Sequence, residues 1–270
     1  MTKKTSFTPT VDQVFRDEAR GKIPFRFDET VANAFDDMAA RSIPGYAMSL
    51  RTAVWLAREH IAPQHTEGVI YDLGASTGAL EHALLSCPES TSWRFVAVDK
   101  SPEMIARAQA RVAAHPRAHT ITWRTEDVQD TPIENALLVV SHYCLQFVAP
   151  SARSAILDRI FAGLHPGGYL LLSEKTSDEP HEAPYFRSRY EAFKRDQGYT
   201  QQEIDNKKHA LEGVLIPWSA QQNEKALCDA GFESPVLVTK HWNFATWIAK
   251  KPARNEGRPV PNASRAPKEC

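Results

Sequence analysis

The sequence contains no long apolar run, and this absence excludes two classes of protein. No stretch approaches the roughly 20 consecutive apolar residues that a membrane-spanning helix needs. The N-terminal segment MTKKTSFTPTVDQVF holds charged residues but lacks the continuous hydrophobic region of a secretory signal. We therefore expect a cytoplasmic protein with no membrane contact.

Cysteine and net charge are also scarce. The four cysteines show neither a C-x-x-C pair nor another metal-ligand spacing, and the ten histidines are scattered, so no metal site is expected. The formal net charge of −1 provides no overall basic field that would attract nucleic acid. With 42% hydrophobic and 24% charged residues, the composition is that of an ordinary globular protein.

Composition divides the chain into three parts. Residues 1–24 are polar and charged and form an N-terminal extension. Residues 251–270 are rich in Pro, Lys, Arg and Asn, and such a segment cannot bury enough apolar surface to offset its ordering entropy. We expect a disordered tail there. Residues 25–250 are the folded domain, with a helical cap at about 178–215.

Within the domain, short apolar runs alternate with helical segments. This alternation predicts a Rossmann-like α/β fold with a doubly wound parallel sheet. A closing antiparallel pair is expected near the C-terminal end of the domain. The expected strands are residues 69–74, 93–99, 120–123, 136–142, 169–173, 236–239 and 243–249. The expected helices are residues 79–86, 101–114 and 151–164, with a further one ending before Gly231.

A glycine-containing turn follows the first expected strand. Residues 71–78 read YDLGASTG. Gly74 permits a tight turn and close approach of a ligand, and Gly78 lets the following helix pack near the strand. Ligands of open α/β sheets bind at this carboxyl edge. The G-x-G-x-x-G spacing of NAD enzymes is absent, so the turn by itself indicates a ligand site without naming the ligand.

Acidic residues follow the next two strands. Asp99 ends the second strand, where a carboxylate can accept hydrogen bonds from both hydroxyls of a ribose. Its alternative role as a helix N-cap is already supplied by Ser101. Glu126 and Asp127 follow the third strand and can bind an adenine amino group. A glycine turn followed by two acids in this order is typical of class I methyltransferases, so S-adenosylmethionine (SAM) is the expected cofactor.

Two longer motifs are more specific. They are residues 41–46, reading RSIPGY, and residues 173–175, reading SEK. Together with the glycine turn they make residues 25–250 resemble the carboxy-SAM synthase family, a branch of the class I methyltransferase fold. Those enzymes join SAM with prephenate to give carboxy-SAM and phenylpyruvate. The resemblance implies a small-molecule substrate, a homodimer and no direct contact with nucleic acid.

The resemblance also implies a set of ligand contacts. These cofactor-binding positions are Tyr46, Gly74, Ala75, Ser76, Asp99, Lys100, Asp127 and Val128, with His142 beside them. The family has asparagine at the position of His142, and at the position of Lys208 it has an arginine that holds the added carboxylate. Lysine offers a point charge where arginine makes two parallel hydrogen bonds. We expect His142 to be neutral, because the sulfonium of SAM would repel a cation.

These two departures leave several reactions open. Methyl transfer from SAM to a small molecule under the cap ranks first, with His142 as candidate general base and Lys208 as candidate substrate-binding residue. Tyr185 and Tyr190 are candidates to face the sulfonium, since aromatic faces attract cations. Carboxy-SAM synthesis ranks second. Intramolecular cyclisation of SAM to azetidine-2-carboxylate, with release of methylthioadenosine, is third, and a non-enzymatic SAM-binding module is fourth.

Overall fold

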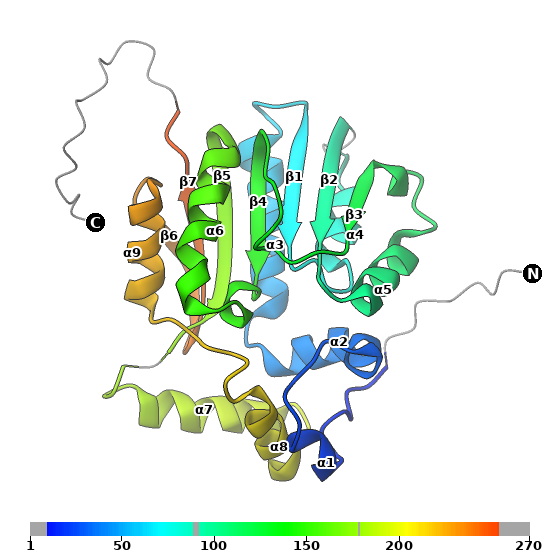
Figure 1. Ribbon diagram of the computed structural model, residues 1–270, viewed down its shortest axis with the longest axis vertical. Coiled ribbons are helices and arrows are strands. Elements are labelled where there is room, and N and C mark those ends of the chain that lie inside the picture. The colour runs from blue at the N-terminus through cyan, green and yellow to red at the C-terminus, as the bar shows by residue number, and fades with distance from the viewer. Residues whose placement is uncertain (1–9, 89–91, 178, 254–270) are drawn as a thin grey trace, which may run out of the picture.

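A seven-stranded sheet forms the centre of the computed structural model, which describes residues 10–88, 92–177 and 179–253 (Figure 1). The strand order is β3-β2-β1-β4-β5-β7-β6. Strands β1 to β5 run parallel, and β7 pairs antiparallel with both β5 and β6. This arrangement confirms the predicted doubly wound sheet and its antiparallel pair. The strands are β1 Glu67–Leu73, β2 Ser92–Val98, β3 Ile121–Arg124, β4 Ala136–His142, β5 Leu164–Lys175, β6 Val236–His241 and β7 Phe244–Lys250.

Helices cover both faces of the sheet and build two apolar cores. One core packs side chains of α3, α4 and α5 against one face, and the other packs α6 and α9 against the opposite face. Central strands read as continuous apolar runs because both of their faces are buried. The helices are α3 Tyr46–Leu56 with the π-helical turn η1 Ala57–Ile61, α4 Ala79–Leu85, α5 Pro102–Val112, α6 Pro150–Gly163 and α9 Ala220–Ala230. Short 3-10 turns include η3 Ala118–Thr120 and η4 Leu145–Phe147.

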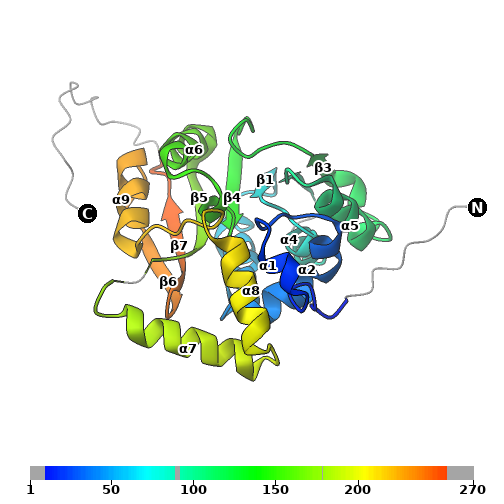
Figure 2. The ribbon, with the colours of Figure 1, turned by 60° about the horizontal axis from the view of Figure 1, so that its bottom comes forward.

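Four further helices form a cap beneath the carboxyl ends of the parallel strands (Figures 1 and 2). The cap consists of α1 Glu18–Gly21, α2 Glu29–Ser42, α7 Ala183–Asp196 and α8 Gln201–Leu211. The sequence predicted only its second half, at about 178–215. Val14 and Phe15 are buried in one apolar cluster with Met38 of α2 and Ala210 of α8. The N-terminal segment from residue 10 onward is therefore part of the cap.

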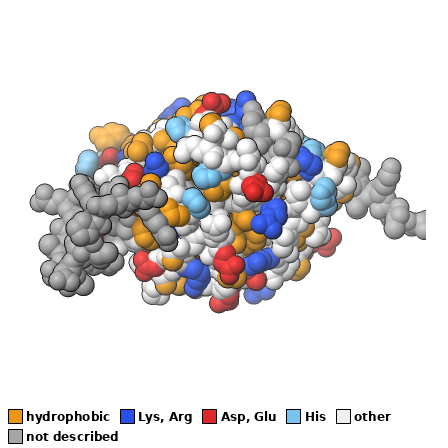
Figure 3. Space-filling model, turned by 90° about the horizontal axis from the view of Figure 1, so that it is seen from above, with side chains coloured by type: hydrophobic (Ala, Val, Ile, Leu, Met, Phe, Trp, Pro, Cys, Tyr) orange, Lys and Arg blue, Asp and Glu red, His pale blue; other side chains and the backbone are white. Residues whose placement is uncertain are grey.

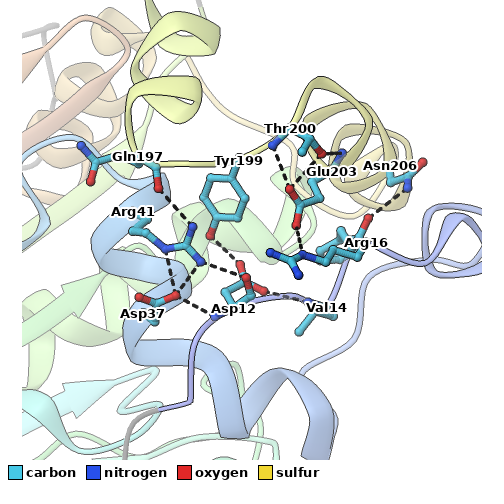
Figure 4. Close-up of polar contacts among 11 residues, drawn as sticks. Asp12, Val14, Arg16, Asp37, Arg41, Gln197, Tyr199, Thr200, Glu203 and Asn206 are labelled. Atoms are coloured by element: carbon cyan, nitrogen blue, oxygen red, sulfur yellow. Dashed lines mark hydrogen bonds and ion pairs between the residues drawn. The ribbon is translucent and has the colours of Figure 1, made fainter.

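Asp12 fastens this N-terminal segment to the rest of the cap (Figure 4). Its backbone N–H donates to Asp37 Oδ2 at 2.7 Å, and its carbonyl accepts from Arg41 Nη2 at 2.9 Å. The Tyr199 hydroxyl donates to Asp12 Oδ2 at 2.5 Å. Arg41, the first residue of the RSIPGY motif, thus joins α2, the N-terminal segment and the α7–α8 connection.

The surface at the end of the molecule opposite the cap has no single chemical character. Figure 3 shows Lys and Arg, Asp and Glu, and histidine side chains interspersed with apolar ones over this surface. None of the helices in the described ranges combines the length and apolar character that crossing a bilayer requires. The predicted tail lies almost entirely outside these ranges, which end at Ala253.

Candidate functional site

A cavity of about 220 Å³ lies between the carboxyl edge of the sheet and the cap. Loops that follow β1, β2, β3 and β4 supply one wall, while α2, α7 and α8 supply the other. All predicted cofactor-binding residues line this cavity: Tyr46, Gly74, Ala75, Ser76, Asp99, Lys100, Asp127, Val128 and His142. Parallel strands bring their carboxyl ends to one edge, which explains how residues so distant in sequence meet.

The turn between β1 and α4 is held against the end of β2. Gly74 has φ +85°, and a Cβ there would lie 2.7 Å from Cys144 Sγ, so this position needs glycine. The Gly74 backbone N–H donates to the Val98 carbonyl at 2.8 Å. Ser76 has φ 47° and donates its N–H to Asp99 Oδ2 at 2.9 Å. These contacts leave the turn open toward the cavity.

The Asp99 carboxylate is held in one orientation by two backbone donors. Oδ1 accepts from Ser101 N at 2.9 Å, and Oδ2 accepts from Ser76 N at 2.9 Å. Burial raises the pKa of Asp99, and these two hydrogen bonds oppose that rise. An ionised carboxylate has about four lone-pair sites, so capacity remains for two ribose hydroxyls.

Asp72, the residue before Leu73 at the end of β1, is a site residue that the sequence interpretation did not single out. It lines the cavity, and its side-chain Oδ1 is buried without a hydrogen-bond partner among the described residues. Burial, and then the neighbouring carboxyl group of Glu81 in α4, raise the pKa of Asp72. A buried acceptor without a partner is costly unless a ligand satisfies it, so Asp72 suits a cationic group. The sequence feature that could have identified Asp72 is its position, because it is an acidic residue directly before the Leu73-Gly74 turn.

His142 is the last residue of β4 and is enclosed by aromatic rings. Its ring centroid lies 4.9 Å from that of Tyr46 and 4.7 Å from that of Tyr143. Its Nε2 is 2.7 Å from Ser49 Oγ. Burial lowers the pKa of His142 to about 3, so the imidazole is neutral. A group of such low basicity is a weak proton acceptor near neutral pH.

Lysine side chains gather at the cap side of the cavity. Lys175 from the end of β5 and Lys207 from α8 both line it. Lys175 Nζ and Lys194 Nζ lie 5.0 Å and 4.3 Å from the centroid of the Tyr190 ring. Ser42 accepts from Lys207 Nζ through its Oγ and from the Tyr190 hydroxyl through its carbonyl, each at 2.9 Å. We call Lys175, Lys194 and Lys207 the lysine cluster.

The lysine cluster carries closely spaced positive charge. Burial, and then the charges of Lys175 and Lys207, lower the pKa of Lys194 to about 7. Burial also lowers the pKa of Lys207 to about 8, with Arg41 and Lys175 adding to the effect and Asp12 opposing it. Burial is the main cause of both lowered pKa values, and the neighbouring cations add to it.

Two of the predicted site residues do not line the cavity. Tyr185 is 75% exposed and does not line the cavity, whereas Tyr190 does. Five helical positions correspond to a rotation of about 140°, which turns the two tyrosines of α7 to different sides. Lys208 is exposed on α8, and its neighbour Lys207 lines the cavity instead.

Comparisons with known proteins agree with this geometry. A family model described as a methyltransferase domain matches residues 70–168. A carboxy-S-adenosyl-L-methionine synthase of Wolinella succinogenes is 36% identical over 241 residues, covering 89% of this chain and 98% of that protein. A protein of the same name from Geobacter sp. strain M21 is 39% identical over 257 residues, covering 93% and 100% of the two chains.

Solved structures of lower identity share the fold. A putative SAM-dependent methyltransferase of Methanococcus maripaludis has a TM-score of 0.55 at 22% identity, covering 86% of this chain and 96% of that chain. Human N-acetylserotonin methyltransferase in complex with SAM has a TM-score of 0.53 at 18% identity, covering 89% and 58%.

Fold and site together define a SAM-dependent transferase of the class I methyltransferase type, as the sequence predicted. Within that class, the sequence identity of the two relatives and the share of each chain that they cover identify the family. The chain belongs to the carboxy-S-adenosyl-L-methionine synthase family.

Proposed function

We propose that the cavity binds SAM beside a small anionic co-substrate, and that the reaction is the synthesis of carboxy-SAM from SAM and prephenate. The observation that carries this proposal is the lysine cluster at the cap side of the cavity. The sequence interpretation ranked methyl transfer first because His142 and Lys208 replace an asparagine and an arginine of the family. Lys208 does not line the cavity in this chain, whereas Lys175 and Lys207 do.

The remainder of the cavity fits the parts of SAM. Asp99 and Asp127 both line the cavity, which supports the proposal that they bind the ribose hydroxyls and the adenine amino group of SAM. Phe27 and Phe147 pack edge to face with centroids 5.1 Å apart and supply an apolar wall for the purine. Asp72 Oδ1, buried without a partner in the described chain, suits the α-ammonium group.

Charge balance supports an anionic co-substrate. SAM brings a sulfonium cation into a cavity whose lysine cluster is already positive, which raises the electrostatic energy of the complex. Carboxylates of prephenate would offset that charge and accept charge-assisted hydrogen bonds from Lys175 and Lys207. An uncharged methyl acceptor would leave the repulsion in place.

The proposed reaction balances without a redox partner. The carboxyl carbon leaves the ring of prephenate and becomes bonded to the carbon of the sulfonium methyl group, which loses a proton. The ring hydroxyl leaves and takes up that proton as water, giving phenylpyruvate. This balance requires no strong base at His142, whose pKa of about 3 makes base-assisted methyl transfer the less well supported reaction.

Mass spectrometry of the purified protein incubated with SAM alone, and then with SAM and prephenate, tests the proposal. Carboxy-SAM and phenylpyruvate formed only with prephenate would support it. Methylthioadenosine formed from SAM alone would overturn it in favour of cyclisation. Unchanged SAM in both incubations would also overturn it and restore methyl transfer to another acceptor as the leading hypothesis.

We further propose that the protein acts as a homodimer in the cytoplasm, following the family resemblance and the lack of long apolar segments. Light scattering should then give twice the monomer mass, and a monomer at assay concentrations would contradict the first part. Cell fractionation tests the second part.

A further inference from the structure

Gln146 is a buried glutamine whose side chain joins the turn after β4 to the end of β5. It lies in the η4 turn, lines the cavity and is 4% exposed. Its Oε1 accepts a hydrogen bond from the backbone N–H of Lys175, the last residue of β5, at 2.8 Å. A reversed amide would set its NH2 group against that N–H, so this contact fixes which end of the amide is the oxygen.

The NH2 group at the other end of this amide has no acceptor in the described chain. Nε2 donates no hydrogen bond to a residue within the ranges 10–88, 92–177 and 179–253. It is not sealed off from solvent, however, as the unpaired Asp72 Oδ1 is. Since Gln146 lines the cavity and is otherwise buried, the NH2 group is accessible from the cavity. A hydrogen-bond donor is therefore presented to the bound ligand.

The backbone around Gln146 is held in place by buried contacts. Its carbonyl accepts from Ile216 N at 2.9 Å and from Arg153 Nη2 at 3.4 Å, and Arg153 is 2% exposed. The preceding residue is also fixed, because Leu145 N donates to Glu174 Oε1 at 3.0 Å. A donor held in this way loses little conformational freedom when a ligand binds, as a preorganised site requires.

The strand order places this donor in the half of the cavity away from the proposed ribose and adenine positions. Asp99 and Asp127 follow β2 and β3, which lie on one side of β4. Gln146 is fastened to the end of β5, on the other side of β4, where Lys175 belongs to the lysine cluster. A ligand group that meets an NH2 donor beside ammonium groups is one that accepts hydrogen bonds and carries negative charge.

We propose that Gln146 is a specificity-determining residue that donates from Nε2 to a carboxylate oxygen of the anionic co-substrate. The inference rests on the proposed function, in which that co-substrate is prephenate. Lysine ammonium groups on flexible stems attract an anion as point charges, whereas an amide fixed at its oxygen end donates along set directions. Gln146 therefore orients the carboxylate that the lysine cluster attracts.

Two variants of similar length separate the donor from the contact with β5. Gln146→Glu keeps an oxygen that can accept from Lys175 N but replaces the NH2 donor by a second acceptor, and Gln146→Met removes both groups. Isothermal titration calorimetry with prephenate is performed on the full chain saturated with S-adenosylhomocysteine, which has no methyl group to react. We expect the Kd for prephenate to rise about tenfold or more in both variants, the effect of losing a hydrogen bond to a charged group. The Kd for S-adenosylhomocysteine should stay within about twofold, which also shows that each variant folds.

A role confined to holding β5 would give a different pattern. Gln146→Glu would then keep the wild-type Kd for prephenate while Gln146→Met lost affinity, and this result would overturn the inference. Wild-type values in both variants, or an equal loss of affinity for S-adenosylhomocysteine, would overturn it as well. Gln202→Glu, exposed on α8, is the matched control and should keep both affinities.

Nuclear magnetic resonance of the wild type gives a result that needs no variant. In protein labelled with 15N at its glutamine side chains, one NH2 signal should shift when prephenate is added to the S-adenosylhomocysteine complex. No shifted signal would overturn the inference even if neither variant folded. Prephenate binding that depends on Gln146, without any carboxy-SAM formed from SAM, would refute the proposed reaction and leave the role of Gln146 supported. A wild type that does not bind prephenate would overturn both.

Discussion

Substitution of Lys207 by methionine provides a direct test of the lysine cluster. Lys207 Nζ lines the cavity and donates a single described hydrogen bond, to Ser42 Oγ at 2.9 Å. Methionine has a similar length and no charge. We expect Lys207→Met to raise KM for prephenate while leaving the Kd for SAM unchanged or slightly lower, because a cation that repels the sulfonium is removed.

The magnitude follows from the contact that is lost. A hydrogen bond between a charged donor and a carboxylate contributes about 1.5–3 kcal/mol. Since each 1.4 kcal/mol is a factor of about ten, KM should rise by about 10- to 150-fold. Lys208→Met is the matched control, because Lys208 is exposed on the same helix, and its KM should change less than about twofold. Steady-state assays of phenylpyruvate formation measure both variants.

Stability provides a control that separates binding from folding. The pKa of Lys207 is lowered to about 8 in the folded protein and is near its usual, higher value in the unfolded chain. The folded state therefore binds fewer protons between pH 8 and that higher value, and stability rises with pH through this window. Lys207→Met should lack this rise in denaturation measurements and keep its fold at neutral pH. A wild-type KM in Lys207→Met, or an equal loss in Lys208→Met, would refute the assignment of the cluster.

Three further substitutions test other parts of the site. Asp99→Ala should weaken SAM binding at least tenfold, about 1.4 kcal/mol, and unchanged affinity in a binding titration would contradict the ribose assignment. His142→Asn should keep turnover within about threefold, because the buried neutral imidazole is a weak base. A loss of about 100-fold with SAM affinity retained would instead indicate general base catalysis. Tyr199→Phe removes a hydrogen bond to the buried Asp12 carboxylate and should lower the free energy of unfolding by about 1–3 kcal/mol in urea titrations, whereas no change would show that the N-terminal segment is held by other contacts.

Local patterns in the sequence were sufficient to predict the sheet and one wall of the site. Strands buried on both faces read as continuous apolar runs, and the capping role of Ser101 is confirmed by its Oγ accepting from Met104 N at 3.1 Å. The position of Asp99 at a strand end places it at the carboxyl edge whatever else packs there. Such features depend on residues that are neighbours in the chain, so they can be predicted without tertiary information.

Only tertiary packing decided which residues line the opposite wall of the site, on the side of the cap. Whether Lys207 or Lys208 enters the cavity depends on the rotation of α8 about its axis, since adjacent helical positions differ by about 100°. The contact of Asp12 with Tyr199 joins residues 187 positions apart, and no local pattern predicts such a pairing. By itself the sequence determined the fold class and the cofactor edge of the site. Only the packing of distant helices decided which cations border the cavity, because side-chain direction is set by the contacts of the whole helix.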